Sequence, residues 1–316
     1  MDRVRRVIGC EHREVKHYTG RGIYVAILDS GVAAHPDLRG RIAAFKDFVS
    51  NKNIAYDDNG HGTHVSGILA GNGAVSKGKY RGIAPESMLV CGKVLDKEGG
   101  GSLKNLTKGL IWISDLIKSV PIRILNISIE MESEEGIDPD DWEQFRKYIR
   151  YLWDRNIMIV AAAGNKGPNP MTLSPIGECG GCVCVGCHDG DYKPKHGRPC
   201  NEYSSRGPGK DTSAVCNPLK KPDIVAPGTD IVSCGAHFRT TPYISKSGTS
   251  MSAPIVSGAC ALCLQKYPQL TNGELRRLLL GSAMDLGQSW GVQGAGMLRI
   301  DSLLAQGYFY TGSPKD

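Results

Sequence analysis

Apolar runs of four to eight residues recur along the chain, and each leads into a polar or glycine-rich segment. The first, residues 23–28, contains no charged residue and runs directly into Asp29. A run of this length without polar alternation predicts a strand that is buried on both faces of a parallel sheet. Five later runs have a similar character and predict further strands: residues 88–94, 122–129, 157–163, 182–186 and 223–226.

Segments with helical periodicity lie between these runs. The clearest begins at Asp138-Pro139, a capping residue and a first-turn proline, and its apolar side chains recur at helical spacing: Trp142, Phe145, Ile149 and Leu152. Strands that alternate with helices predict an α/β fold of three layers, with helices on both faces of a mostly parallel sheet. No repeat or long linker interrupts the pattern, so we expect one domain over residues 21–304, with a short N-terminal extension (1–20) and a C-terminal tail (305–316).

Composition narrows the class of protein and its compartment. The 316 residues are 41% hydrophobic, enough for a sizeable core, and the net charge of +6 is scattered without the basic stripe of a nucleic-acid-binding surface. No apolar stretch is long enough to cross a membrane. The eleven cysteines are an odd number, and many sit beside Val, Ala or Leu, as buried free thiols do in a reducing compartment. We therefore expect a cytoplasmic protein; a chain already stripped of a leader would look similar.

Three polar motifs carry the candidate chemistry. Asp29 closes the first predicted strand, His61 opens a helix within residues 59–67, and Ser250 follows a Gly-Thr turn within residues 247–254. Taken singly, each has a structural explanation as a turn residue, a packed side chain or a helix cap. Taken together they form a reactive set, because a serine hydroxyl becomes nucleophilic when an imidazole accepts its proton, and a carboxylate orients that imidazole. The chain order Asp, His, Ser is one of those known for this triad.

These motifs resemble the active-site signatures of the subtilisin-like serine peptidases. The matching segments are residues 29–31, 61–64 and 248–254, and the resemblance extends from about residue 20 to residue 304, with framework matches at 80–85, 203–208 and 221–228. Within that family the chain looks closest to the intracellular-type bacterial enzymes. The resemblance implies a serine endopeptidase that acts on polypeptides, with Asp29, His61 and Ser250 as its triad. By the same match, His64 packs inside the protein and is not the base.

The resemblance also assigns residues around the triad. Residues 161–165 match the family's oxyanion segment, so the amide of Asn165, which follows Gly164, should donate to the tetrahedral intermediate. Two backbone edges should hold an extended substrate between them, and they comprise Ser128, Ile129, Gly99, Gly100 and Gly101. Without the resemblance, a flexible turn explains the three glycines equally well.

Three positions depart from the usual family pattern. Glu130 stands where glycine is usual, Lys166 follows the predicted oxyanion asparagine, and Leu173 replaces a small residue. We expect these side chains to line the primary specificity pocket and to make it shallower and charged, although no substrate preference follows from the sequence. The acidic run of residues 130–143 has two explanations: a rim that attracts cationic peptides, or a solvated loop.

Signals for cofactors are weaker. Residues 73–80 nearly spell a phosphate-binding loop, but Tyr80 stands where Ser or Thr must bind magnesium. The spacing of Cys179, Cys182, Cys184 and Cys187 suggests a metal site, yet alternate residues of a strand face opposite sides. Asp37 matches a calcium ligand of secreted relatives, but residues 72–79 do not resemble their calcium loop. We expect no required cofactor, and structural calcium is doubtful.

Two other functions remain as alternatives. A catalytically silent, peptide-binding or regulatory pseudoprotease would usually lack a triad residue, and none is missing here. A nucleotide-binding α/β enzyme would need a glycine-rich phosphate loop after the first strand, where residues 29–32 stand instead. The sequence gives no indication of the oligomeric state.

Overall fold

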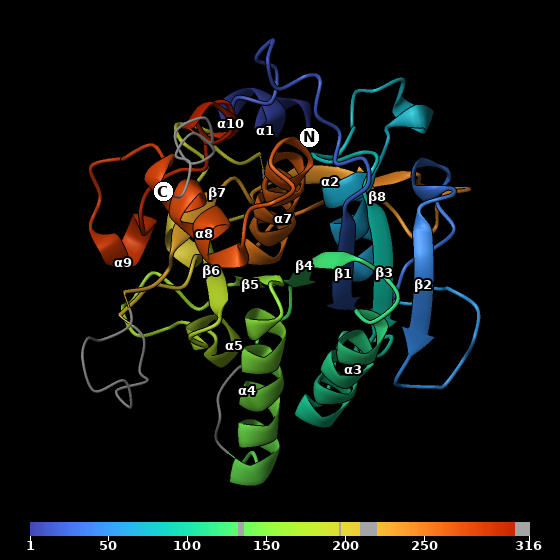
Figure 1. Cartoon of the computed structure of the whole chain (residues 1–316). Coiled ribbons are helices and arrows are strands. Elements are labelled where there is room, and N and C mark those ends of the chain that lie inside the picture. Colours follow the sequence, from blue (N-terminus) through green and yellow to red (C-terminus); the bar gives the residue numbers. More distant parts are fainter. Residues whose placement is uncertain (132–135, 196, 209–219, 307–316) are drawn as a thin grey trace, which may run out of the picture.

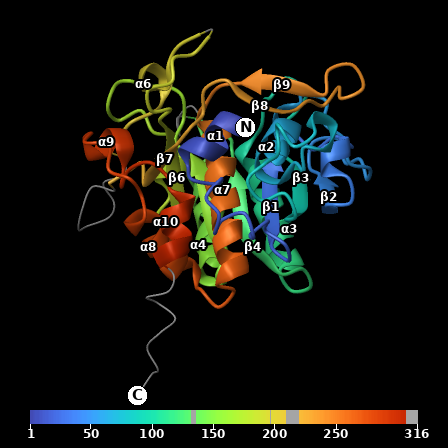
Figure 2. The same ribbon diagram turned by 90° about the horizontal axis from the view of Figure 1, so that it is seen from above.

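A computed structural model of the chain describes residues 1–131, 136–195, 197–208 and 220–306 (Figures 1 and 2). The helices are α1 (Asp2–Val7), η1 (Pro36–Leu38), α2 (His61–Ala70), η2 (Ala74–Ser76), α3 (Leu103–Leu116), α4 (Pro139–Asp154), α5 (Pro175–Glu178), α6 (Cys200–Tyr203), α7 (Thr249–Lys266), α8 (Asn272–Gly281), α9 (Trp290–Gln293) and α10 (Ile300–Gln306). The strands are β1 (Tyr24–Asp29), β2 (Ile42–Asp47), β3 (Met88–Lys93), β4 (Ile122–Ile127), β5 (Met158–Ala162), β6 (Cys182–Cys187), β7 (Ile224–Ala226), β8 (Ile231–Cys234) and β9 (Tyr243–Lys246).

Seven parallel strands form the central sheet, in the order β2-β3-β1-β4-β5-β6-β7. All six predicted strands belong to it, which confirms the α/β prediction. Strand β1 pairs with β3 on one side and with β4 on the other, so the chain reverses its direction of travel across the sheet at β1. Ligands of such sheets bind outside the carboxyl ends of the strands at this reversal. Asp29, the last residue of β1, lies at that position.

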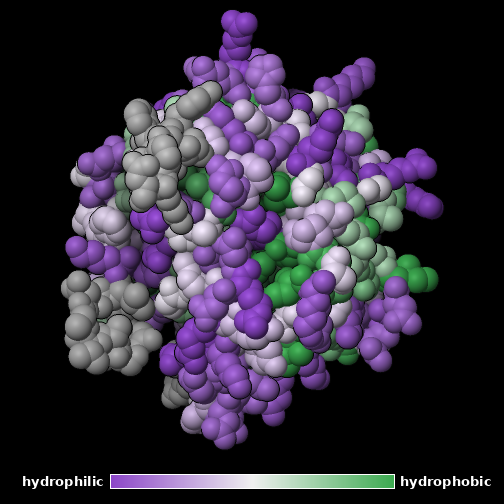
Figure 3. All heavy atoms as spheres, viewed as in Figure 1, coloured by the Kyte–Doolittle hydropathy of each residue, from purple (hydrophilic) through white to green (hydrophobic). Residues whose placement is uncertain are grey.

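Helices cover both faces of the sheet, which gives the three layers (Figure 1). Helices α3 and α4 pack on one face through a core that includes Leu110 and Phe145. Helices α2, α7, α8 and α10 pack on the other face through a larger core that includes Ile68, Ile255 and Leu279. The space-filling view shows the side of the molecule seen in Figure 1, where the surface is mainly hydrophilic and apolar residues show in a hollow near the middle (Figure 3).

Helix α4 confirms the prediction made from residues 138–152. The Asp138 side chain accepts a hydrogen bond from the backbone N–H of Asp140 at 2.9 Å, and Pro139 occupies the first turn. The four residues predicted to face the core are its buried ones: Trp142, Phe145, Ile149 and Leu152.

The sequence did not predict β2 or the antiparallel hairpin of β8 and β9. Strand β2 is at the edge of the sheet and carries Lys46, and most of its residues are partly or fully exposed. The residues of β9 are also partly or fully exposed. Neither strand has the uninterrupted apolar run that marks a buried strand, because an edge strand needs fewer apolar side chains.

The first twenty residues, which we expected to form an extension, pack against the domain. Met1, Val4, Ile8, Cys10 and Val15 are buried in the same core as α7. Of the expected tail, residues 307–316 lie outside the described residues. No described helix combines the length and the apolar character that a membrane span requires.

Candidate active site

Asp29 and His61 are brought together by the end of β1 and the start of α2. The His61 Nδ1 atom lies 2.7 Å from Asp29 Oδ1, in hydrogen-bond geometry. Asp29 is 1% exposed, and its Oδ1 also accepts the N–H of Ser30 at 2.7 Å. Its Oδ2 has no hydrogen-bond partner among the described residues. The imidazole is therefore held at Nδ1 by a buried carboxylate, which leaves Nε2 as the nitrogen that can exchange a proton.

The environment of His61 favours the protonated imidazole. Burial lowers the pKa of His61, but the charge of the Asp29 carboxylate and its hydrogen bond outweigh this effect and raise the pKa above the usual 6.5. The side chain is 22% exposed, so a substrate can reach it. The raised pKa makes His61 a stronger base than a free imidazole.

A buried carboxylate that the sequence analysis missed holds the start of α2. Asp57 accepts the N–H groups of Gly60 and Thr63 at 2.7 and 2.8 Å. It also accepts the hydroxyl of Ser30 at 2.9 Å, which ties α2 to the end of β1. Asp57 stands four residues before His61 and is not the N-cap, which is Gly60, so the usual capping pattern does not mark it in the sequence.

Ser250 lies in the first turn of α7 and is 8% exposed. The turn before it is made by Gly248, with φ of 148°, as predicted from the Gly-Thr sequence. The helix is buried from Thr249 to Leu264 and packs on α2 and on β4, β5 and β6. These contacts bring Ser250 to the same end of the sheet as Asp29 and His61. No hydrogen bond joins Ser250 to His61 within the described part of the chain; such contacts are often long before a substrate binds.

Asn165 follows β5 and contacts the residue before Ser250. Its Oδ1 accepts the backbone N–H of Thr249 at 2.9 Å, and the Thr249 hydroxyl accepts the N–H of Gly164 at 3.1 Å. Its Nδ2 donates to Glu130 Oε2 at 2.9 Å. The predicted oxyanion donor and the predicted nucleophile are therefore neighbours, and an acidic side chain touches the donor.

Of the predicted pocket residues, Glu130 accepts hydrogen bonds from Asn165, and Gly164 precedes Asn165 in the chain. Gly164 has φ of 103°, and a Cβ atom there would stand 2.9 Å from Ser205 Oγ, so only glycine fits. Ser128 is buried and its hydroxyl accepts from Asn126. The Lys166 side chain is exposed, whereas Leu173 is buried with Ala163 and Cys184.

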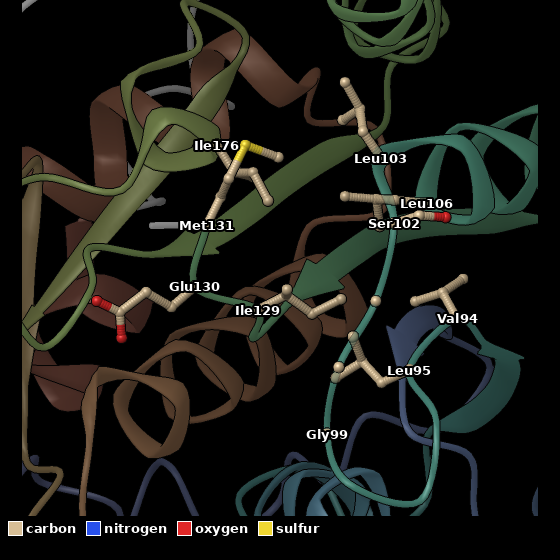
Figure 4. A pocket seen from close by; sticks show the side chains of 12 residues that line it. Val94, Leu95, Gly99, Ser102, Leu103, Leu106, Ile129, Glu130, Met131 and Ile176 are labelled. Carbon is tan, nitrogen blue, oxygen red and sulfur yellow. The ribbon is translucent and has the colours of Figure 1, made fainter. Parts of the chain in front are cut away.

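A cavity of about 320 Å³ extends from Glu130 along the predicted substrate cleft (Figure 4). The three glycines Gly99, Gly100 and Gly101 line one side of it, and Ile129 and Met131 line another. The glycines form a turn that closes on Asp96, whose N–H donates to the Gly100 carbonyl at 2.8 Å. The three glycines are thus part of a turn that also lines this cavity, and their role as a substrate edge stays a prediction. Residues 132–135 of the acidic run lie outside the described residues.

His64 packs inside the protein, as predicted. It is fully buried, and its Nε2 lies 2.9 Å from the carbonyl oxygen of Ile231. Burial lowers the pKa of His64 to about 3, so the imidazole is uncharged at neutral pH.

Asp37, the residue that matches a calcium ligand, does not offer a calcium site. Its Oδ1 accepts the N–H of Val75 at 3.0 Å, and its Oδ2 accepts the Tyr243 hydroxyl at 2.6 Å. The ligating side chains grouped with it are His35 and Cys234, and calcium needs six to eight oxygen ligands. These residues do not fit the ion.

The four cysteines spaced like metal ligands separate into different clusters. Cys179 and Cys182 pack in the core on the α3 and α4 face, Cys184 packs with Leu173, and Cys187 packs with Cys200 and Tyr203. Cys187, Asp189 and Cys200 do converge, but Cys187 contacts both Asp189 and the Tyr203 hydroxyl. The remaining oxygen of Asp189 accepts from Arg3 and from two backbone N–H groups. This group is satisfied by hydrogen bonds among the described residues.

Known proteins with similar sequences are proteases. The chain is 37% identical over 279 residues to the serine protease AprX of Bacillus subtilis (strain 168), and this match covers 83% of the chain and 61% of AprX. It is 31% identical over 285 residues to Subtilisin Savinase of Lederbergia lenta, and this match covers 90% of the chain and 91% of Savinase. The chain therefore spans less than two thirds of AprX and nearly all of Savinase.

Solved structures and a family match agree with these similarities. Sphericase superposes with a TM-score of 0.76 at 26% identity and covers 94% of this chain and 96% of its own. A cold adapted subtilisin-like serine proteinase gives a TM-score of 0.68 at 26% identity and covers 89% of this chain and 90% of its own. Residues 20–300 match the family described as Peptidase_S8, Subtilase family. On this match, on the relatives and on its seven-stranded parallel sheet, the chain belongs to the subtilase family.

Proposed function

We propose that the chain is a serine endopeptidase that hydrolyses peptide bonds through an acyl-enzyme on Ser250. The Ser250 Oγ atom attacks the peptide carbonyl carbon while His61 Nε2 takes its proton, and His61 then gives this proton to the leaving amine. A water molecule, activated in the same way, releases the acyl group. The observation that carries the proposal is the hydrogen bond between His61 Nδ1 and the buried Asp29.

Asn165 and the backbone N–H of Ser250 are the proposed donors to the oxyanion. The N–H groups of a first helical turn have no partner within their helix, so the N–H of Ser250 can donate to a negative oxygen. The Thr249 N–H fixes the orientation of the Asn165 amide by donating to its oxygen, which leaves the NH₂ group as the donor. A donor held in place before the reaction stabilises charge that develops in the transition state.

The proposed substrate is a polypeptide bound in extended form. Family membership supports polypeptide substrates. We assign one edge of the cleft to Ser128 and Ile129 and the other to Gly99, Gly100 and Gly101, between which the cavity of Figure 4 can receive side chains. Glu130, Gly164, Lys166 and Leu173 complete the primary pocket in this proposal.

We further propose that the enzyme works in the cytoplasm, needs no cofactor and is of the intracellular bacterial type. The ten described cysteines are buried and none forms a disulfide, which supports a reducing compartment. The resemblance in sequence supports the intracellular type.

Labelling with a serine-directed fluorophosphonate, followed by mass spectrometry, tests the proposal. The label should be found on Ser250 of the parent protein and should be absent from the Ser250→Ala variant. Casein hydrolysis should fall to near background in that variant, while its melting curve stays unchanged. A pseudoprotease would neither be labelled nor cleave casein, and equal cleavage by parent and variant would disprove the role of Ser250.

A further inference from the structure

The acidic side chain of Glu130 occupies a place next to the predicted oxyanion donor. Three residues after the end of β4, its carboxylate accepts two hydrogen bonds from Asn165: one from the backbone N–H at 3.0 Å and one from Nδ2 at 2.9 Å. In Figure 4 the carboxylate points away from the apolar side chains of Ile129 and Ile176. It forms no ion pair within the described part of the chain.

These contacts leave the Asn165 amide with one unused donor. The amide carries two N–H bonds, one of which points at Glu130 Oε2, while its oxygen accepts the Thr249 N–H at 2.9 Å. The second N–H remains for the substrate oxygen. Glu130 therefore helps to orient the donor, but it also places a negative charge beside the point where the reaction creates a negative oxygen.

Two negative charges so close oppose each other unless a positive charge lies between or beside them. The Asn165 contacts only share the charge of Glu130, because they come from neutral N–H groups. The side chain of Lys166, the next residue, is exposed, where water weakens its effect. The compensating cation can come from the substrate.

We propose that Glu130 selects a basic side chain, lysine or arginine, on the substrate residue whose carbonyl is attacked, here called the acyl residue. The proposal rests on the proposed peptidase function and names its substrate class. The attacked carbonyl oxygen binds at Asn165, whose amide also contacts Glu130. The Cα atom that carries the side chain of the acyl residue is two bonds from that oxygen, so this side chain begins close to the Glu130 carboxylate. Gly164 leaves space between the acyl residue and the Glu130 carboxylate, because a Cβ atom at this position would stand 3.2 Å from Glu130 Oε1.

A pair of substrates that differ only in charge tests this directly. Two peptides with the same sequence and leaving group carry either arginine or its neutral isostere citrulline as the acyl residue. We expect the parent protein to show a kcat/KM at least about tenfold higher for arginine, the size expected of a close, partly desolvated charge pair. Equal values for the two peptides would overturn the proposal without any variant.

The Glu130→Gln variant adds a signature that a purely structural role would not give. It keeps the size of the side chain and one of the two acceptor oxygens for Asn165, and it removes the charge. Its kcat/KM for the arginine peptide should fall, and its kcat for the citrulline peptide should rise, because the oxyanion no longer faces a carboxylate. A matched control is Glu143→Gln on α4, where the side chain is 61% exposed and contacts Arg150. The Glu143→Gln variant should keep the preference for the arginine peptide. If this variant loses the preference, the attraction belongs to the whole acidic run and the role of Glu130 is overturned.

Binding to the Ser250→Ala variant separates this proposal from the peptidase function. Calorimetry should show tighter binding of the arginine peptide than of the citrulline peptide, and the difference should shrink when Glu130→Gln is added. If the parent is labelled by the fluorophosphonate and cleaves casein but shows no preference for arginine, only the role of Glu130 fails. If labelling and cleavage are absent while arginine-selective binding persists, only the peptidase function fails. If selective binding is absent as well, both are wrong.

Discussion

At the scale of single residues, the proposed oxyanion donor Asn165 gives a prediction about catalysis. In the bound substrate the carbonyl is neutral, and a hydrogen bond from Asn165 gains little; as Ser250 attacks, the oxygen becomes negative and the bond strengthens. Asn165→Ala should therefore lower kcat by about 10²–10³-fold, the range known for the corresponding asparagine of a subtilisin. The KM should change only a few-fold, and steady-state kinetics would show both values.

A control separates this effect from damage to the pocket. Asn169→Ala makes the same change at an exposed position a few residues away and should leave kcat unaltered. If Asn165→Ala instead raises KM and lowers the melting temperature together, the side chain has a structural role. An unchanged kcat would remove it from the oxyanion site.

His61 gives a prediction about pH. Its pKa is raised above 6.5 and its neutral form accepts the serine proton, so kcat/KM should fall as pH drops through a value above 6.5. The effect on stability has the opposite sign: because the folded pKa exceeds the unfolded one, the stabilisation by protonated His61 is complete below pH 6.5 and is lost as pH rises through the folded pKa. Rate profiles and unfolding free energies between about pH 5 and 9 measure both. An activity midpoint below 6.5 would contradict the effect of Asp29 on His61.

The sequence predicted which residues meet at the site but not how they touch. Asp29 and His61 were predictable because their motifs are local and the chain order is informative. The contact between Glu130 and Asn165 was not, since it depends on how the ends of β4 and β5 lie relative to each other, and no local pattern encodes that placement.

At the scale of single elements, the start of α2 depends on Asp57. Asp57→Asn replaces one of the two carboxylate oxygens with an NH₂ group that faces another donor, so the buried N–H of either Gly60 or Thr63 loses its partner. The free energy of unfolding should fall by about 1–3 kcal/mol. The kcat should fall too, because His61 is the first residue of this helix. Urea unfolding and kinetics on the same samples measure both effects.

The stability that the Asp57→Asn variant loses should also depend on pH. Burial raises the pKa of Asp57, but hydrogen bonds from Thr63 and Gly60 outweigh this and lower it below the usual 3.8. The stabilisation is therefore present above pH 3.8 and disappears as pH falls through the lowered folded pKa. Asp191→Asn, at an exposed position, is the control and should change stability by no more than about 0.5 kcal/mol. A similar loss in both variants would exclude a specific role for Asp57.

Most of the elements that the sequence predicted are buried ones. Strands β1, β3, β4, β5, β6 and β7 and helix α4 carry uninterrupted or strictly periodic apolar residues, because their neighbours exclude water from them. Edge strand β2 and strand β9 carry mostly exposed side chains, which leave little mark on the apolar pattern. Strand β8 is mostly buried, but its four residues include Ser233 and are too few to form a clear apolar run.

At the scale of the whole molecule, the described cysteines act as core residues. All ten are buried, and burial raises the pKa of the Cys91 and Cys263 thiols to about 12. A thiol reagent should react with at most one cysteine of the native protein, Cys216, which lies outside the described residues, and with all eleven after denaturation. Reductant should leave activity and melting temperature unchanged. Rapid reaction of several thiols in the native protein would contradict the buried placement.

Helix α7 comes after every strand of the central sheet in the chain, yet it packs against the middle of that sheet. During translation, the ribosome makes Asp29 and His61 early and Ser250 late, and α7 is complete only when Lys266 has left the exit tunnel. Until then the growing polypeptide has no nucleophile next to His61. On the function proposed above, a nascent chain therefore has no assembled triad, and the order of elements delays the onset of proteolysis until the sheet has been synthesised.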